Sequence, residues 1–448
     1  MHVQVSQPRY REAGRPRWRN ITRAGILIVA SALGIAACSS ASSSSATNTS
    51  ASGGVVSFQL WESHNGPPVG TEVSTLVNEF NASHKNIHVT VVVTKASTKL
   101  LAAVAAGDPP VLAEISHYDG KYVKAGALVS WNSFMKGSSV VNSTNMVPAA
   151  WTNGEVNGQH YRLMADLKLS EVFYNKTMFA KAGISAVPAT WPQLQADVSL
   201  IKNKLPGVIP LGWKDSSAHI LPAIMSNGGA MLAGGNSVGH SVDFADTAGT
   251  ATFSYFHSLY TAGELQFHHG TTLREDLAAG KIAMIDGTSA GYQKVLTAVS
   301  GKFPVGAFVE PAGSTGHAYN MAQGLGFVLP KGHTQAQDEA AWTFVQWWFG
   351  AARQANWAES TGYAPETHAG IGAIPSSFLS AHPGLQASLS AATSPYTFGR
   401  PVSDSYKEVQ TALDTEFFNA VTGKQSVASA LAALQNQGNS YMSGASEL

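Results

Sequence analysis

Short runs of apolar and β-branched residues alternate along most of this chain with longer segments whose apolar residues recur at helical spacing. The run Val55–Trp61 predicts a strand, positions 69–80 predict a helix, and Ile87–Val93 predicts a second strand. A short helix at Lys99–Ala106 and a strand at Val111–Ile115 follow. Strand–helix–strand units of this kind form parallel sheets covered by helices, so the sequence predicts the α/β class.

The alternation continues to the end of the chain. Thr190 precedes Trp191 and Pro192, which is the residue pattern of a helix N-terminus. The segment Thr334–Ser360 predicts one long helix, and its aromatic stripe is expected in the core. Further helices are expected at 273–280, 405–421 and 427–442, and further strands at 282–286 and 324–329.

Chain length and charge narrow the class of protein. The 448 residues exceed the size at which one hydrophobic core keeps growing, so two lobes are expected. The 28 basic residues balance the 28 acidic ones, and nucleic-acid binding would require a basic excess. The single cysteine, Cys38, excludes an internal disulfide and a cysteine-based zinc site.

The first residues read as an export signal. Arg9–Arg23 carries six Arg and one Glu, and the apolar run Ala24–Ala37 that follows is too short to span a bilayer. The segment Ile35–Cys38 resembles the bacterial lipobox, whose cysteine is acylated after cleavage. Ser39–Gly54 consists almost entirely of Ser, Ala, Thr, Asn and Gly, which is the composition of a flexible tether.

The sequence therefore predicts a lipoprotein signal peptide at 1–37 and a tether at 38–54. The mature protein is expected to be secreted and anchored by a lipid on Cys38 to the outer face of the bacterial cytoplasmic membrane. A buried N-terminal helix with an incidental cysteine is the alternative.

Several short motifs together resemble one family, the extracellular solute-binding proteins of ABC importers that carry sugars and glycerol phosphate. They are Trp61-Glu62-Ser63-His64, Gly107-Asp108-Pro109-Pro110, Val172-Phe173-Tyr174-Asn175-Lys176, Gly280-Lys281-Ile282-Ala283-Met284, Gln323-Gly324-Leu325-Gly326, Thr361-Gly362-Tyr363-Ala364-Pro365 and Gly399-Arg400-Pro401. Each motif is weak alone, but their order over most of the mature chain is specific.

The resemblance implies a two-lobe periplasmic-binding-protein-like α/β fold with a ligand cleft between the lobes. It places hinge crossings near Asp166–Ser170 and Tyr319–Gly324. It implies lobe 1 at 55–166 and 320–370, and lobe 2 at 167–319 and 371–448. It also implies a monomer without enzymatic activity, cofactor or metal, which binds a small polar ligand and docks on ABC permease subunits.

Some candidate ligand contacts follow from the residues themselves. Trp61 and His64 follow the first strand, where open α/β sheets bind ligands. Thr288 and Ser289 follow a strand and open a helix, whose N–H groups suit an anion or a hydroxyl. Tyr363 lies in a loop bounded by Gly and Pro, so its ring is expected outside the core. A purely structural role is the alternative for each of these residues.

Other contacts are implied by the resemblance. Arg400 matches an arginine that meets phosphate, a role that suits its planar fork of donors. Trp213 matches a stacking tryptophan, and Gly324 matches a position where the backbone approaches the ligand. An acidic family residue falls on His117, with Asp119 two positions later.

An enzyme is the alternative function. Residues 287–291, Gly-Thr-Ser-Ala-Gly, fit the G-x-S-x-G pattern of a serine hydrolase with Ser289 as nucleophile. Partners would come from Asp338 or Asp404 and from His368 or His382. The pattern has three fixed positions and arises easily in a chain with 43 Gly, so binding is the favoured interpretation.

Overall fold

The computed structural model describes residues 54–116, 119–214, 216–233, 241–268, 270–400, 403 and 405–443. The signal segment, Cys38 and the tether up to Gly53 lie outside these residues, as does His117. No helix within the described ranges has both the length and the apolar character needed to cross a membrane.

The first sheet contains the N-terminal strands. Its order is β2 (Ile87–Val93), β1 (Val56–Glu62), β3 (Leu112–Ile115), β14 (Gly326–Pro330) and β4 (Leu128–Val129), and β7 (Arg162–Met164) also pairs with β14. The strands β1, β2 and β3 run parallel, whereas β14 is antiparallel to its three neighbours.

The second sheet is built from the middle of the chain. Its order is β10 (Leu265–Phe267), β9 (Ile209–Trp213), β11 (Ile282–Thr288), β8 (Ser170–Asn175) and β12 (Val305–Val309). The first three strands are parallel and β8 is antiparallel to both of its neighbours. Two small pairs complete the strands: β13 (Asn320–Met321) with β15 (Thr397–Phe398), and β5 (Glu155–Val156) with β6 (Gln159–His160).

The expectation of parallel sheets is thus only partly right, because both sheets are mixed. A parallel neighbour requires a crossover connection, usually a helix. The strands β8 and β14 enter their sheets directly from segments that join the two sheets, so they run against their neighbours.

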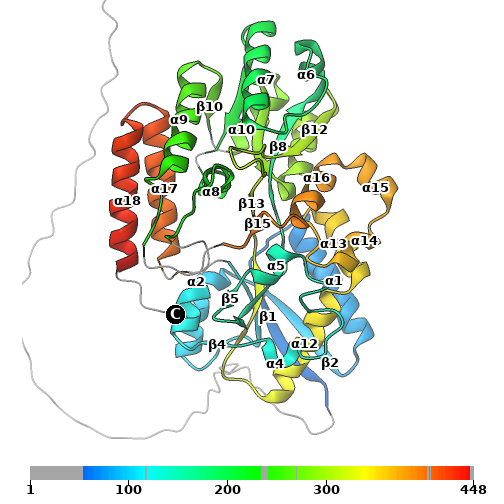
Figure 1. Cartoon of the computed structure of the whole chain (residues 1–448). Helices are drawn as coiled ribbons and strands as arrows, with labels where there is room; N and C mark the ends of the chain where they lie inside the picture. The colour runs from blue at the N-terminus through cyan, green and yellow to red at the C-terminus, as the bar shows by residue number, and fades with distance from the viewer. Residues whose placement is uncertain are drawn as a thin grey trace, which may run out of the picture. The chain divides into compact units, whose positions relative to one another are not determined.

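Helices cover both sheets (Figure 1). Those between or after strands of the first sheet are α1 (Val69–Ser83), α2 (Ala96–Ala105), α3 (Asp119–Lys124), α4 (Asn132–Met135), α5 (Pro148–Thr152), α12 (Gln335–Trp348), α13 (Ala351–Thr361), α14 (His368–Ala373) and α15 (Ser376–Ala381). The others are α6 (Lys176–Ala182), α7 (Trp191–Lys204), α8 (Ser217–Ser226), α9 (Thr247–Thr261), α10 (Gly270–Ala278), η1 (Ser289–Gly291), α11 (Tyr292–Val299), α16 (Pro383–Ala392), α17 (Tyr406–Val421) and α18 (Val427–Ser443).

The sequence signals explain most helix boundaries. Thr190 caps α7 with a full capping box, in which its side chain accepts from the Gln193 N–H and the Gln193 side chain accepts from the Thr190 N–H. The expected single helix at Thr334–Ser360 is wrong: α12 ends at Trp348, and Gly350 adopts extended backbone before α13 begins. The aromatic stripe is nevertheless buried, as expected.

Each sheet has its own hydrophobic core. The first sheet packs with α1, α12 and α13, and its core also takes Leu385 and Leu389 from α16. The second sheet packs with α7, α8 and α9 and with the closing pair α17 and α18, which lie side by side (Figure 1). Smaller clusters lie against α2 and α3 at the first sheet and against α10 and α11 at the second. Each sheet thus has apolar clusters of its own, which confirms the two-lobe expectation that followed from chain length.

The chain crosses between the sheets twice in adjacent positions. Residues 165–169 lead from β7 to β8, and residues 322–325 lead from β13 to β14. The two crossings are hydrogen-bonded to each other, because the Lys168 N–H donates to the Gln323 carbonyl at 2.9 Å and the Gln323 N–H donates back at 3.0 Å. The crossings implied by the resemblance, near Asp166–Ser170 and Tyr319–Gly324, overlap these two segments.

Polar side chains fix the crossings. The Glu366 carboxyl accepts from the Leu167 N–H at 2.7 Å, and Asn320 accepts from the Ser170 N–H at 3.0 Å. Gly324 has φ +142°, and a Cβ there would lie 1.8 Å from the Asp166 carbonyl oxygen. Only glycine allows the two crossing backbones to approach this closely.

Candidate functional site

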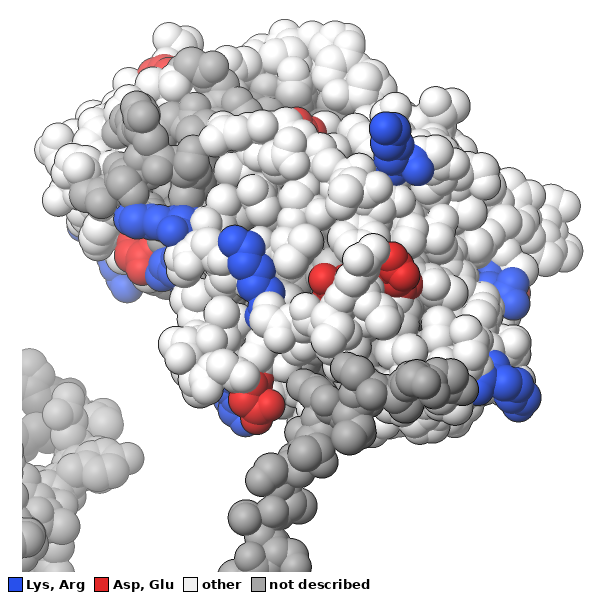
Figure 2. All heavy atoms as spheres, turned by 90° about the horizontal axis from the view of Figure 1, so that it is seen from below, with Lys and Arg blue, Asp and Glu red and all other residues white. Residues whose placement is uncertain are grey.

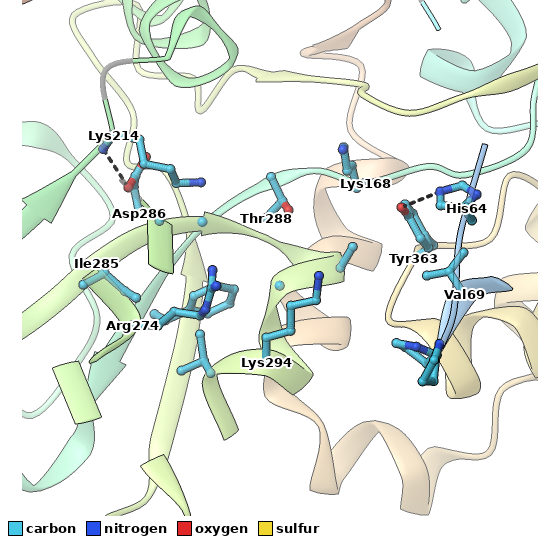
Figure 3. A pocket seen from close by; sticks show the side chains of 18 of the residues that line it. His64, Val69, Lys168, Lys214, Arg274, Ile285, Asp286, Thr288, Lys294 and Tyr363 are labelled. Atoms are coloured by element: carbon cyan, nitrogen blue, oxygen red, sulfur yellow. Dashed lines mark hydrogen bonds between the residues drawn. The ribbon is translucent and has the colours of Figure 1, made fainter. Parts of the chain in front are cut away.

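A cavity of about 320 Å³ lies where the two crossings meet the sheets. One side is formed by the loop from His64 to Val69 and by Tyr363, which belong to the part of the chain around the first sheet. The other side is formed by Lys168 and by residues of the second sheet and of α10 and α11. Figure 3 shows His64 and Tyr363 on one side, Lys214, Asp286 and Arg274 on the other, and Lys168, Thr288 and Lys294 between them.

His64 is surrounded by three buried carboxylates, which we call the acidic cluster: Glu62, Glu114 and Asp166. Its Nδ1 lies 2.6 Å from Glu62 Oε1 and 3.7 Å from Glu114 Oε2, and its Nε2 lies 3.3 Å from Asp166 Oδ2. The Tyr363 hydroxyl lies 3.5 Å from the same Nε2 (Figure 3). Both ring nitrogens of His64 therefore face oxygen atoms.

The acidic cluster keeps His64 charged. Burial lowers the pKa of the imidazole, but hydrogen bonds with Asp166, Glu114 and Glu62 raise it by more, so the net pKa is raised well above the ordinary value. Burial raises the pKa of the Glu114 carboxyl, and the nearby Asp166 and Glu62 raise it further. These shifts favour a positively charged His64 held by the carboxylates behind it.

The same residues include a possible set of metal ligands. One ligand atom each from Glu62, His64 and Glu114 lies within 4.8 Å of the others. The Glu114 Oε2 atom is buried and has no hydrogen-bond partner. A divalent cation would need His64 in its neutral form, whereas the carboxylates favour the imidazolium.

Four cationic side chains line the cavity, and we call them the cationic wall: Lys168, Lys214, Arg274 and Lys294. They come from a crossing, from the residue after β9, from α10 and from α11. The sequence analysis selected none of them. Asp286 is the one carboxylate among the described residues that line the cavity. Its Oδ1 accepts from the Lys214 backbone N–H at 2.9 Å (Figure 3).

A second buried histidine, His219, lies close to the Asp286 carboxylate. His219 Nδ1 lies 2.9 Å from Glu310 Oε1, and its Nε2 lies 3.6 Å from Asp286 Oδ2. Burial lowers the pKa of His219, and the charges of Lys214 and Lys168 lower it further. Burial and the charge of Asp286 raise the pKa of the Glu310 carboxyl. Both shifts favour the uncharged forms of His219 and Glu310.

Three of the residues selected from the sequence line the cavity: His64, Thr288 and Tyr363. Tyr363 differs from expectation, because its ring belongs to the first core and is only 5% exposed. It stacks on Trp357 at a centroid distance of 5.7 Å, and this places the hydroxyl at the cavity. A loop bounded by Gly and Pro can still deliver an aromatic side chain to a core when a partner ring lies beneath it.

The other selected residues whose side chains or backbone are described do not line the cavity. Trp61 is partly buried at the end of β1, and Gly324 contacts the Asp166 backbone. Trp213 is buried in the second core against Phe256, with ring centroids 5.0 Å apart. Arg400 is half-buried beside β15 and is not named among the lining residues.

The structure does not describe the side chains at the position where the resemblance implied an acidic contact, His117 or Asp119. His117 lies outside the described residues, and Asp119 begins α3 with a side chain that is not described.

Ser289 is buried behind the cavity. Its Oγ accepts from the Leu169 N–H at 3.4 Å. Within the described residues, no histidine forms a hydrogen bond with this hydroxyl, and His382 Nδ1 instead pairs with the Phe378 carbonyl at 2.8 Å. Asp404 lies outside the described residues. The geometry thus provides Ser289 with no visible base.

Comparison with known proteins assigns the family. The family model of bacterial extracellular solute-binding proteins matches residues 75–387. The curated proteins contain no match. Among solved structures, the cyclic α-maltosyl-1,6-maltose binding protein of Arthrobacter globiformis is 20% identical with a TM-score of 0.75, covering 87% of this chain and 100% of its own.

Two further structures show the same fold. The sugar-binding protein MalE of Xanthomonas citri is 18% identical with a TM-score of 0.77, covering 86% of this chain and 97% of its own. UgpB of Mycobacterium tuberculosis, in complex with glycerophosphocholine, is 17% identical with a TM-score of 0.73, covering 87% and 99%. The expected two-lobe α/β fold is confirmed, and the chain belongs to the bacterial extracellular solute-binding proteins.

Proposed function

We propose that this protein is a lipid-anchored solute-binding protein that delivers a small polar ligand, a sugar or a glycerol phosphate, to an ABC importer. The observation that carries the proposal is the cavity of about 320 Å³ at the paired crossings, with walls from both sheets. A ligand held there touches both lobes, so binding favours a closed arrangement of the lobes. The permease subunits would recognise that closed form.

The proposed ligand contacts differ in whether they line the cavity. His64, Tyr363 and Thr288 present polar atoms to the cavity and are the first candidates. Tyr363 offers a hydroxyl and a ring edge, which suits a polyol. Trp61, Trp213, Ser289 and Gly324 would act indirectly, by shaping the walls. Arg400, His117 and Asp119 are proposed as further ligand contacts because the family resemblance implies them.

We propose a monomer with one lobe around each sheet, held to the outer face of the membrane by a lipid on Cys38. The support is the order of basic, apolar and small residues before that cysteine. Cys38→Ala should release the protein into the medium or leave it unprocessed. Partitioning of the wild-type protein into the aqueous phase of a detergent extraction would contradict the anchor.

We propose that the protein has no hydrolase activity, because Ser289 is buried and hydrogen-bonded to backbone. A serine-directed fluorophosphonate probe should not label it. Labelling that disappears in Ser289→Ala would favour the hydrolase instead.

A thermal-shift screen against sugars, polyols and phosphodiesters tests the binding function. A ligand at about 100 times its dissociation constant should stabilise the protein by about 2.7 kcal/mol. Failure of every compound class to raise the melting temperature would count against the proposal.

A further inference from the structure

The cationic wall has no anionic partner in the described structure. None of Lys168, Lys214, Arg274 and Lys294 forms an ion pair with a described carboxylate. Arg274 donates to the Thr271 hydroxyl at 3.1 Å, which leaves its charge unbalanced. Among the described lining residues, these four cations face the one carboxylate of Asp286, which also accepts a backbone N–H.

Such a concentration is not a general property of this surface. Charged residues make up 12% of the chain, and the face in Figure 2 shows scattered basic and acidic side chains on a mostly uncharged surface. Three members of the wall, Lys168, Lys214 and Arg274, are partly buried. Like charges in a partly desolvated site repel, and an anion between them removes the repulsion.

The charges of the wall interact with one another. Burial lowers the pKa of the Lys168 ammonium, and repulsion by Arg400, Lys214 and Lys294 lowers it further, while Asp166 opposes the change. Lys214 and Lys294 therefore lie within electrostatic reach of the Lys168 ammonium. Glu62 and Asp166 lie 2.6 Å and 3.3 Å from the ring nitrogens of His64, so their charge is already paired there.

The two sides of the cavity differ in chemistry. The side with His64 and Tyr363 carries the Tyr363 hydroxyl and the His64 imidazole, polar groups that suit ligand hydroxyls. The cationic wall pairs with negative charge, and the Thr288 hydroxyl lies between the two (Figure 3). A ligand that satisfies both sides has a polyol end and an anionic end.

Building on the proposed function, we propose that the ligand is a phosphorylated sugar or polyol whose phosphate contacts Lys168, Lys214, Arg274 and Lys294 and whose hydroxyls face His64 and Tyr363. Phosphate is favoured over carboxylate because a dianion with three exposed oxygens engages several cations at once. The phosphate lies at this wall and not at Arg400, the position implied by the family resemblance.

The test is to measure by calorimetry the affinity of the purified protein for phosphorylated compounds and for their unphosphorylated counterparts. The pairs are glucose 6-phosphate with glucose, and glycerol 3-phosphate with glycerol, with maltose, glucuronate and inorganic phosphate as single probes. The phosphorylated member of a pair should bind at least about tenfold more tightly than its neutral partner. Added salt should weaken this binding, and inorganic phosphate should compete with it.

Variants locate the anion. Arg274→Gln and Lys294→Gln should each weaken the phosphorylated probe about ten- to hundredfold and leave any neutral probe within about threefold. Both residues lie on helix surfaces, so folding should be preserved. Lys204→Gln, which removes an exposed charge at the end of α7, is the matched control and should change nothing.

The possible results distinguish the phosphate inference from the proposed binding function. Maltose or glucose binding as tightly as the phosphorylated probes overturns this inference and leaves the binding function in place. Tighter binding of glucuronate than of glucose 6-phosphate overturns the choice of phosphate. Phosphate-dependent binding that both variants leave unchanged overturns the location. Failure of every probe, neutral and anionic, contradicts the proposed function as well.

Discussion

Glu366→Gln should stabilise the protein at alkaline pH, because the carboxyl it replaces is buried at the crossings. Glu366 is fully buried, one of its oxygens accepts from the Leu167 N–H, and the other has no hydrogen-bond partner. Burial raises the pKa of this carboxyl from 4.5 to about 8, against the opposing effect of the Leu167 hydrogen bond. The folded state therefore holds a proton that the unfolded state releases.

The sign and size of the effect follow from this shift. Because the pKa of Glu366 is higher in the folded than in the unfolded state, this group's contribution to the free energy of unfolding is greatest below pH 4.5. The contribution falls as pH rises toward about 8. A difference of about 3.5 units at about 1.36 kcal/mol each gives an upper loss of about 5 kcal/mol. Glutamine keeps the acceptor for Leu167 and does not ionise.

The assay is urea unfolding of both proteins at a pH of about 5 and of about 9. The variant should match the wild type at the lower pH and exceed it by several kcal/mol at the higher pH. Glu339→Gln, which changes an exposed residue on α12, is the control and should show no such divergence. A Glu366→Gln protein that is less stable than wild type at the higher pH would refute the reasoning.

Three further substitutions test the site and the crossings. His64→Asn leaves the acidic cluster without its cation and should cost about 3–5 kcal/mol in urea unfolding, whereas exposed His88→Asn should cost little. Tyr363→Phe keeps the ring on Trp357, so stability should persist while calorimetric ligand affinity falls about tenfold; unchanged affinity would remove Tyr363 from the site. Gly324→Ala should lower the melting temperature sharply, because its Cβ would lie 1.8 Å from the Asp166 carbonyl; a normal melting temperature would contradict the close crossing.

Local patterns were sufficient to predict most elements of the fold. Alternation and helical spacing gave β1, α1 and β2 with small boundary errors, and the cap at Thr190 gave the start of α7. The break between α12 and α13 was missed because one glycine in an otherwise helical pattern is tolerated in many helices. The mixed sheets were missed because strand direction depends on the route of the crossings.

The candidate site was harder to predict, because its charged residues are far apart in the sequence. Lys168, Lys214 and Lys294 meet only after the crossing and the second sheet have formed. One signal was present: Lys214 directly follows β9, and Thr288 ends its neighbour β11. Residues that follow parallel strands gather at one edge of a sheet, so reading these positions together would have placed Lys214 beside Thr288 at the site.

The acidic cluster illustrates the same limit. Glu62 and His64 belong to a motif that the sequence analysis noticed, but Glu114 and Asp166 come from a strand and a crossing that reach them only in the folded chain. Burial of carboxylates cannot be inferred from residue type, because these residues are mostly exposed in proteins.

Small-angle X-ray scattering of the protein with and without the tightest binder from the matched pairs tests the central claim most directly. The central claim is that a ligand bridges two lobes joined at the crossings of residues 165–169 and 322–325. The account predicts that the radius of gyration falls on saturation and stays unchanged when an unbound member of the panel is added. An unchanged radius of gyration at saturation would contradict closure around the ligand.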